Sequence, residues 1–170
     1  GIGGMECARV LALRGHRPVI HERGERLGGV FVAAARASYK DKMRDLLAWY
    51  ERQMVQLNVD VRLGDEVRDI TELDGPVVVA TGSTPRTLPV PGIELARDYL
   101  ENPPAAQRVV VVGGGLTGCE VAYDAALEGR DVEIVEMADD LVAQKGVCLA
   151  NSSYLREWFA WKQVPVHPET

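Results

Sequence analysis

The stretch from Arg108 to Glu136 limits the fold of this chain more than any other part of the sequence. It opens with a run of valines at 109–112, which is too short and too β-branched for a helix and is followed by glycine. Such a run is typical of a strand that is buried on both faces. Gly113, Gly115 and Gly118 then follow in G-x-G-x-x-G spacing. The pattern predicts a buried strand that turns tightly into a helix.

An apolar helix is predicted over 116–127, and Gly129 ends it. Residues 131–135 form a second predicted strand, which leads to Glu136. In this arrangement the first glycine makes the turn, the middle one lets a pyrophosphate approach the backbone, and the last one lets helix and strand pack closely. The helix N-terminus faces the phosphates and the acid binds the ribose hydroxyls. Because all the parts occur in order, the stretch predicts a dinucleotide site rather than a tight turn without a ligand.

The N-terminus carries part of a second motif of the same kind. Gly1 and Gly4 fit the second and third glycines of a G-x-G-x-x-G, and a helical stretch over 5–14 follows them. A short strand at 18–21 then ends in Glu22, an acid at the expected distance. The first glycine and the strand before it would precede residue 1, so we expect the chain to be a fragment. The alternative is a glycine-rich tail before an unrelated helix.

An amphipathic helix is predicted from about Lys40 to Leu57, after the Gly28–Gly29 pair. The paired glycines would let a second backbone segment approach a pyrophosphate. Apolar residues of the helix recur every three or four positions, which is typical of a face that packs on the core. They are Met43, Leu46, Leu47, Tyr50, Met54 and Leu57.

Further strands are predicted over 59–63, around Val67 within 64–73, and over 76–82. The last of these is expected to be buried, and it ends in small residues that permit close backbone approach by a ligand. These residues are Ala80, Thr81 and Gly82. Prolines between 83 and 107 then predict an extended connection. Near the C-terminus, Ser152–Ser153 are expected to cap a helix through about Lys162, with a strand at 164–167 and with Trp49, Trp158 and Trp161 as packing residues.

The predicted fold class is therefore α/β, with two Rossmann-like three-layer dinucleotide-binding domains that are both incomplete. We expect an FAD-binding domain over 1–86 without its first strand, a linker over 87–107, and an NAD-binding domain over 108–170 that is truncated at its C-terminus. A carboxylate at Glu136 accepts hydrogen bonds from the ribose 2′-OH and repels a 2′-phosphate, so NADH is favoured over NADPH.

Charge and cysteine content exclude several other functions. The net charge of -6, without a basic tail or stripe, argues against nucleic acid or an anionic membrane as a partner. No apolar run approaches the roughly 20 residues that span a bilayer. Cys7, Cys119 and Cys148 lie far apart and form no C-x-x-C pair, which indicates a reducing, cytoplasmic setting. The three histidines are isolated, so no metal site is predicted.

The order of these motifs resembles the flavoproteins with two dinucleotide domains. It is most similar to the C-terminal half of the NADH:flavin oxidoreductases related to old yellow enzyme, which include 2,4-dienoyl-CoA reductase, 2-enoate reductases, bile-acid enoate reductases and trimethylamine dehydrogenase. The resemblance covers most of the chain and is weakest from Leu141 to Thr170. The motifs that carry it are G-x-x-G-M-E at the start, the strand-end Glu22, R-L-G-G at 26–29, A-T-G at 80–82, P-x-P-G at 89–92 and G-x-G-x-x-G-x-E at 113–120.

Carried over to this chain, the resemblance implies two sets of cofactor-binding residues. FAD would be bound by Gly1, Gly4, Glu22, Arg23, Arg26, Gly28, Gly29, Val67, Ala80, Thr81 and Gly82. The nicotinamide dinucleotide would be bound by Gly113, Gly115, Leu116, Thr117, Gly118 and Glu136. Glu120 matches a position that lies near the nicotinamide in related flavin reductases, and the equally weighted alternative is a solvated or capping glutamate.

The resemblance also implies an activity. Hydride would pass from NADH to FAD, and electrons would move on to an FMN and a 4Fe–4S cluster outside this chain, where an activated alkene of the enoate type is reduced. Thioredoxin reductase or lipoamide dehydrogenase chemistry is excluded for this stretch, because it needs a local cysteine pair. Two alternatives remain: the same module in an amine dehydrogenase or a glutamate-synthase-like subunit, and a structural module that holds ADP without turnover. The sequence identifies neither the substrate nor a homo-oligomeric state.

Overall fold

The computed structural model of the protein describes residues 1–170 and divides them into two compact units. The first unit contains residues 1–36 and 40–91, and the second contains residues 37–39 and 92–170. None of the helices combines the length and the apolar character that crossing a membrane requires.

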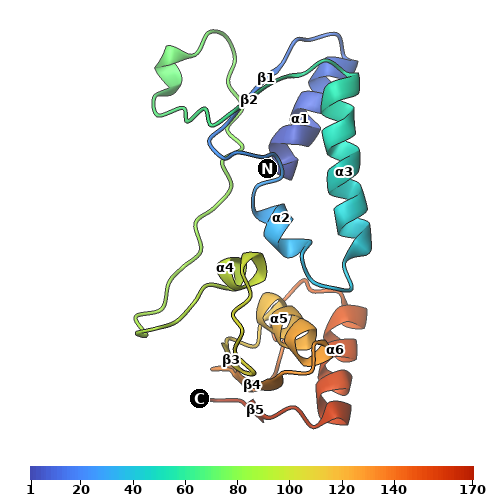
Figure 1. The fold of residues 1–170 in the computed structure, drawn as a ribbon, viewed down its shortest axis with the longest axis vertical. Coiled ribbons are helices and arrows are strands. Elements are labelled where there is room, and N and C mark those ends of the chain that lie inside the picture. Colours follow the sequence, from blue (N-terminus) through green and yellow to red (C-terminus); the bar gives the residue numbers. More distant parts are fainter. The chain divides into compact units, whose positions relative to one another are not determined.

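The first unit is built on a two-stranded parallel sheet. Its elements are α1 (Ile2–Leu13), β1 (Val19–Glu22), α2 (Val30–Ala34), α3 (Asp41–Gln56), β2 (Asp60–Leu63) and the short 3₁₀ helix η1 (Ile70–Glu72). The strands pair from Val19 opposite Asp60 to Glu22 opposite Leu63. Helices α1 and α3 lie side by side (Figure 1). Met5, Ala8, Leu27 and Met54 form the buried core between these elements.

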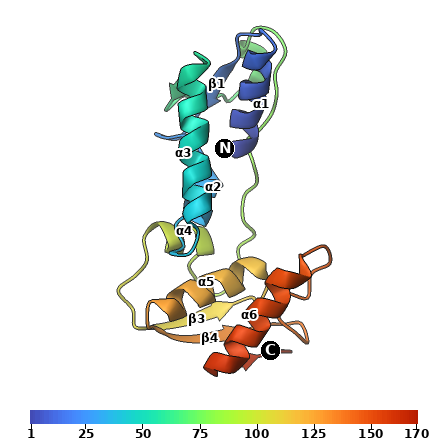
Figure 2. The same ribbon diagram turned by 90° about the vertical axis from the view of Figure 1, so that its right-hand side faces the viewer.

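The second unit is built on a three-stranded parallel sheet of order β3-β4-β5. Its elements are α4 (Ala96–Glu101), β3 (Arg108–Val112), α5 (Leu116–Leu127), β4 (Asp131–Val135), α6 (Leu149–Lys162) and β5 (Val166–His167). Helices α5 and α6 pack against each other beside the sheet (Figure 2). Phe159 of α6, Ile134 of β4 and Cys119 of α5 are the largest fully buried side chains of this unit. The predicted strand–helix–strand order of 108–136 is thus confirmed.

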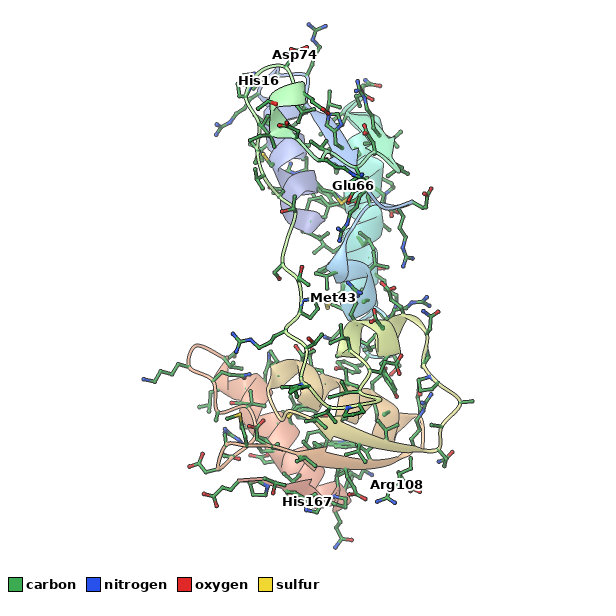
Figure 3. All side chains as sticks on the ribbon, turned by 90° about the vertical axis from the view of Figure 1, so that its left-hand side faces the viewer. His16, Met43, Glu66, Asp74, Arg108 and His167 are labelled. Carbon is green, nitrogen blue, oxygen red and sulfur yellow. The ribbon has the colours of Figure 1, made fainter.

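The open face of this sheet carries charged side chains that connect its three strands. Figure 3 labels Arg108 and His167, which belong to the two outer strands. Glu133 of the middle strand accepts a hydrogen bond from Arg108 Nη2, and its other carboxylate oxygen lies 3.6 Å from His167 Nε2. The hydrogen bond from Arg108 holds the pKa of Glu133 below its usual value. These contacts help to fix the register of the sheet.

Two predicted strands of the first unit are wrong. Residues 76–82 form no strand, and Val78 and Val79 are 62% and 69% exposed rather than buried. The sheet of this unit consists of β1 and β2 alone, so the backbone of 76–82 pairs with no other strand. Residues 64–73 also form no strand. They contain η1, which Asp69 caps by accepting the backbone N–H of Thr71.

Other predictions of burial and capping need correction. The strand β3 is buried on one face only, because Val110 and Val112 are 51% and 48% exposed on the open face. Trp161 is 72% exposed on α6, and Leu46 is exposed on α3, so neither is a core residue. Helix α6 begins at Leu149 with Cys148 as its N-cap, and Ser152 lies inside it and donates its hydroxyl to the Leu149 carbonyl. The predicted serine cap is therefore wrong.

Candidate functional site

The turn between β3 and α5 is made by glycines that no other residue could replace without rearrangement. Gly113 has φ 108°, a left-handed conformation that glycine adopts without a steric penalty. Gly115 is the N-cap of α5, and the chain enters the helix at Leu116. A Cβ atom on Gly118 would overlap the carbonyl oxygen of Gly113. The helix therefore lies as close to the turn as the backbone allows, with its N-terminus open to an anion.

Glu136, one residue beyond β4, lies directly beside this turn. Its Oε2 accepts the backbone N–H of Gly114, and its Oε1 accepts the backbone N–H of Ala138 at 2.7 Å. An ionised carboxylate has about four acceptor positions, so these two hydrogen bonds leave acceptor capacity for ribose hydroxyls. The structure thus brings together the glycines and the acid that the sequence predicts as one site.

A segment that the sequence did not predict also lies on the glycine turn. The backbone N–H of Val142 donates to the Gly114 carbonyl at 2.7 Å, and the side chain of Leu141 packs against Gly114. The side-chain amide of Gln144 lies against Gly115, at the N-terminus of α5. Val142 has φ 50°, a conformation that is unfavourable for a β-branched residue. Such strain persists only where the surrounding contacts impose it.

Arg156 of α6 supplies the contacts that hold this segment. Its Nε donates to the Leu141 carbonyl at 2.8 Å and lies 3.0 Å from Asp140 Oδ2. No local sequence pattern connects Arg156 with residues 140–144, because only the folded chain brings them together.

The first unit repeats the geometry of the second. Helix α1 follows Gly1 as α5 follows Gly115, and each helix has 12 residues. Glu22 at the end of β1 accepts the backbone N–H of Gly24 at 2.9 Å, and its other carboxylate oxygen lies 3.5 Å from the terminal ammonium group of Gly1. Glu136 likewise accepts the backbone N–H two positions later, and in the glycine turn it accepts the backbone N–H of Gly114. Both units therefore place a strand-end carboxylate against the glycine segment that starts a helix.

The Gly28–Gly29 pair lies against this first glycine segment. A Cβ atom on Gly29 would lie 3.0 Å from the Cα of Gly1, and Gly29 has φ 56°. A Cβ atom on Gly4 would lie 3.4 Å from that of Ala80, so the start of the A-T-G segment is adjacent to α1. These contacts leave two backbone segments that can both approach one pyrophosphate.

The remaining predicted residues are less closely gathered. Thr81, Gly82 and Arg23 are exposed, and Val67 is half-buried after β2. Arg26 is exposed and lines a cavity beside α2 and α3. In the second unit, Leu116 and Thr117 form the first turn of α5. Glu120 lies in the next turn, where its backbone carbonyl accepts the hydroxyl of Tyr39 at 3.3 Å.

Comparison with known proteins identifies the family. The sequence pattern of the pyridine nucleotide-disulphide oxidoreductases matches residues 1–170. The chain belongs to this family. It is 37% identical to a cinnamate reductase of Clostridium sporogenes over 174 aligned residues, which cover 98% of the chain and 26% of that protein. A bilirubin reductase of Mediterraneibacter gnavus is 34% identical over 85% of the chain and 24% of its own length.

A solved structure gives the same result for the fold. The 2-naphthoyl-CoA reductase complex with 2-naphthoyl-CoA superposes on 99% of the chain and 27% of its own length, with a TM-score of 0.85 and 25% identity. The predicted α/β fold and the resemblance to flavoproteins of the enoate reductase type are confirmed. The chain spans about a quarter of the length of each of these proteins.

The three cysteines of this chain do not form a redox-active pair. Cys7, Cys119 and Cys148 are all free thiols. Cys119 is fully buried beneath the glycine turn, where its Sγ lies 3.2 Å from the Gly114 carbonyl oxygen. Burial, and secondarily the nearby charge of Glu136, raise the pKa of Cys119 to about 12. Its thiol is therefore protonated at neutral pH and has no nucleophilic role.

This assignment predicts a strong difference in thiol reactivity. At pH 7.5 we expect a maleimide to label the exposed Cys148 rapidly and to label Cys119 only after unfolding, because the thiolate is the reacting form and Cys119 is inaccessible. Peptide mass spectrometry after timed labelling measures both rates in one sample. Comparable labelling of both cysteines in the folded protein would show that Cys119 is not buried beneath the glycine turn as described.

Proposed function

We propose that this chain is the electron-input module of a flavin oxidoreductase, in which the second unit binds NADH and the first unit binds FAD. The observation that carries the proposal is the duplicated geometry, in which a strand-end carboxylate, Glu22 or Glu136, accepts the backbone N–H two residues later and lies beside the glycine segment that starts a helix. A site that only needed a tight turn would not require the acid. Family membership supports the same reading.

In the second unit, we propose that the N-terminus of α5 binds the pyrophosphate of NADH. The glycines of the turn fit this role, because side chains at Gly115 or Gly118 would fill the space or displace the helix. Glu136 accepts hydrogen bonds from the adenosine ribose and disfavours a 2′-phosphate. Glu120, one turn further along α5, is the candidate for a contact with the nicotinamide.

In the first unit, we propose that Gly1, Gly4 and the Gly28–Gly29 pair surround the pyrophosphate of FAD. Glu22 binds the ribose, and the backbone of Val67 meets the adenine. The close approach of Gly29 to Gly1 supports this assignment, since any larger residue would close the space between the two segments. Bound FAD supplies a hydride acceptor, and the protein contributes position and electrostatics.

We further propose that electrons leave this module for an FMN and iron–sulfur centre outside the chain, where an activated alkene is reduced. The similar reductases support this substrate class, since cinnamate, bilirubin and 2-naphthoyl-CoA are all conjugated molecules. The residues of the two units make no contribution to substrate choice in this proposal.

The test is anaerobic reduction of the full-length protein by each coenzyme. Mixing with NADH should bleach the visible flavin band rapidly, and mixing with NADPH should bleach it more slowly. Bleaching by an amine substrate but not by NADH would instead assign the module to an amine dehydrogenase. If ADP or flavin stays bound and neither coenzyme bleaches it, the module is structural and the electron-input proposal fails.

Gln144 provides a second test of the NADH site. Its side-chain amide lies at the N-terminus of α5, where it can donate to the pyrophosphate. We expect Gln144→Ala to raise the Kd for NADH by about three- to tenfold, the effect of losing one hydrogen bond to a charged group. The isosteric Gln144→Glu should weaken binding further, because it places a carboxylate beside the phosphates. Fluorescence titration with NADH measures both, and wild-type affinity in Gln144→Glu would place the pyrophosphate elsewhere.

A further inference from the structure

A cavity of about 320 Å³ opens in the first unit between α2 and α3. Three arginines from three different segments line it: Arg26 from the loop after β1, Arg36 from the chain just beyond α2, and Arg44 from α3. Val32 and Leu47 belong to its apolar lining. Figure 1 shows α2 beside α3, and Met43, labelled in Figure 3, marks the part of α3 that carries Arg44. Three arginines and one acid, Glu51, thus surround an apolar floor.

The two glycines of the Gly28–Gly29 pair have different nearest neighbours. A Cβ atom on Gly29 would point at Gly1, 3.0 Å from its Cα. A Cβ atom on Gly28 would point the other way, 2.7 Å from Val32 Cγ2 and 2.8 Å from Leu47 Cδ1, both of which line the cavity. Gly28 therefore packs against the residues that line the cavity, and Gly1 and Gly29 are not among those residues. A volume of about 320 Å³ is also at the small end for ligand pockets and suits a molecule much smaller than a dinucleotide.

The arginine of α3 is held in position for a ligand. Arg44 Nη1 donates to the Ala35 carbonyl at 2.6 Å, and its Nη2 pairs with Asp41. These contacts anchor the guanidinium at the C-terminal end of α2, so little side-chain freedom remains to be lost on binding. Arginine side chains recognise carboxylates and phosphates through paired N–H donors.

We propose that this cavity binds a small organic anion, with its carboxylate or phosphate group on the arginines and a short apolar body against Val32 and Leu47. Glu51, which also lines the cavity, is the single acid there and disfavours ligands with a second anionic group at that end. The proposal is independent of the coenzyme assignments, because the anion can bind whether or not NADH is present and whether or not FAD is reduced.

The test is calorimetric titration of the full-length protein with benzoate, phenyl phosphate, inorganic phosphate and benzyl alcohol. Benzoate or phenyl phosphate should bind, and whichever binds tighter identifies the preferred anionic group. Inorganic phosphate should bind about tenfold more weakly, because it lacks the apolar body, and benzyl alcohol should not bind. Arg36→Gln and Arg44→Gln should each weaken binding of the aromatic anion about tenfold or more.

Arg52→Gln is the matched control, because Arg52 lies on α3 next to Glu51 but does not line the cavity. It should leave the affinity unchanged. Arg36→Gln keeps the proposal testable if Arg44→Gln lowers the melting temperature through the lost contact with Ala35. Unchanged binding in Arg36→Gln, an equal loss in Arg52→Gln, or no saturable binding of either aromatic anion would overturn the proposal.

Discussion

Gly118→Ala is expected to destabilise the second unit strongly and to abolish measurable NADH binding. The added methyl group would overlap the carbonyl oxygen of Gly113 and would lie 3.3 Å from Val111 Cγ1. The first of these atoms is backbone at the turn itself, so the clash is relieved only if α5 moves away from the turn. The cost is expected at the upper end of overpacking effects, about 3 kcal/mol, which lowers Tm by more than about 10 °C for a unit of this size.

The stability control for this change is Thr117→Ala, one residue earlier in the same helical turn. Thr117 is exposed, so its replacement should alter stability by no more than about 0.5 kcal/mol. Thermal unfolding followed by circular dichroism, together with NADH titration at 15 °C, separates folding from binding. A Gly118→Ala protein that melts like the wild type would show that α5 and the turn are not packed as closely as the structure indicates.

The second unit could be predicted from its sequence because its signals are local. The valine run, the glycine spacing and the terminal acid each specify one part of a strand–turn–helix–strand unit, and β3, α5 and β4 occupy 108–112, 116–127 and 131–135. Each signal reports a backbone requirement that neighbouring residues create. The consequence for the site is that its glycines and Glu136 could be named before their contacts were known.

The errors arose where the outcome depends on distant partners. The valines at 77–79 have the composition of a buried strand, but composition does not say whether another strand lies alongside to pair with them. The exposure of Val110 and Val112 has the same cause. A strand residue is buried only if another layer covers its face of the sheet, and the periodicity of the sequence does not show whether that layer exists. Propensity is therefore informative about conformation and much less so about burial.

The same reasoning explains the residues of the proposed sites whose contacts the sequence did not indicate. Gln144 reaches the turn only because Arg156 of α6 holds the Leu141 carbonyl and Asp140. Arg26, Arg36 and Arg44 converge only because α2 folds back along α3. In both cases the contacts join segments that are separated by a helix or a loop, so no spacing rule applies to them.

Replacing Glu136 with serine and Met137 with arginine is expected to reverse the coenzyme preference. Loss of the carboxylate removes hydrogen bonds to the ribose and should raise the Kd for NADH by about 10- to 100-fold. Met137 is 86% exposed directly after the acid, so an arginine there can reach a 2′-phosphate without displacing a packed side chain. We expect the Kd for NADPH to fall by about tenfold, as for one charge-assisted pair. Equilibrium titration with both coenzymes measures the ratio.

Glu136 also supports the glycine turn, and this second role must be separated from coenzyme choice. Its carboxylate accepts the backbone N–H groups of Gly114 and Ala138, so its loss loosens the turn for either coenzyme. Glu136→Gln keeps a side-chain carbonyl that can accept one of these N–H groups but removes the charge that repels a 2′-phosphate. If the charge selects the coenzyme, this variant should bind NADPH more tightly than the wild type while Tm falls only slightly. An unchanged ratio of NADH to NADPH affinity in Glu136→Gln would mean that Glu136 acts on the turn alone and that coenzyme preference is set by other residues.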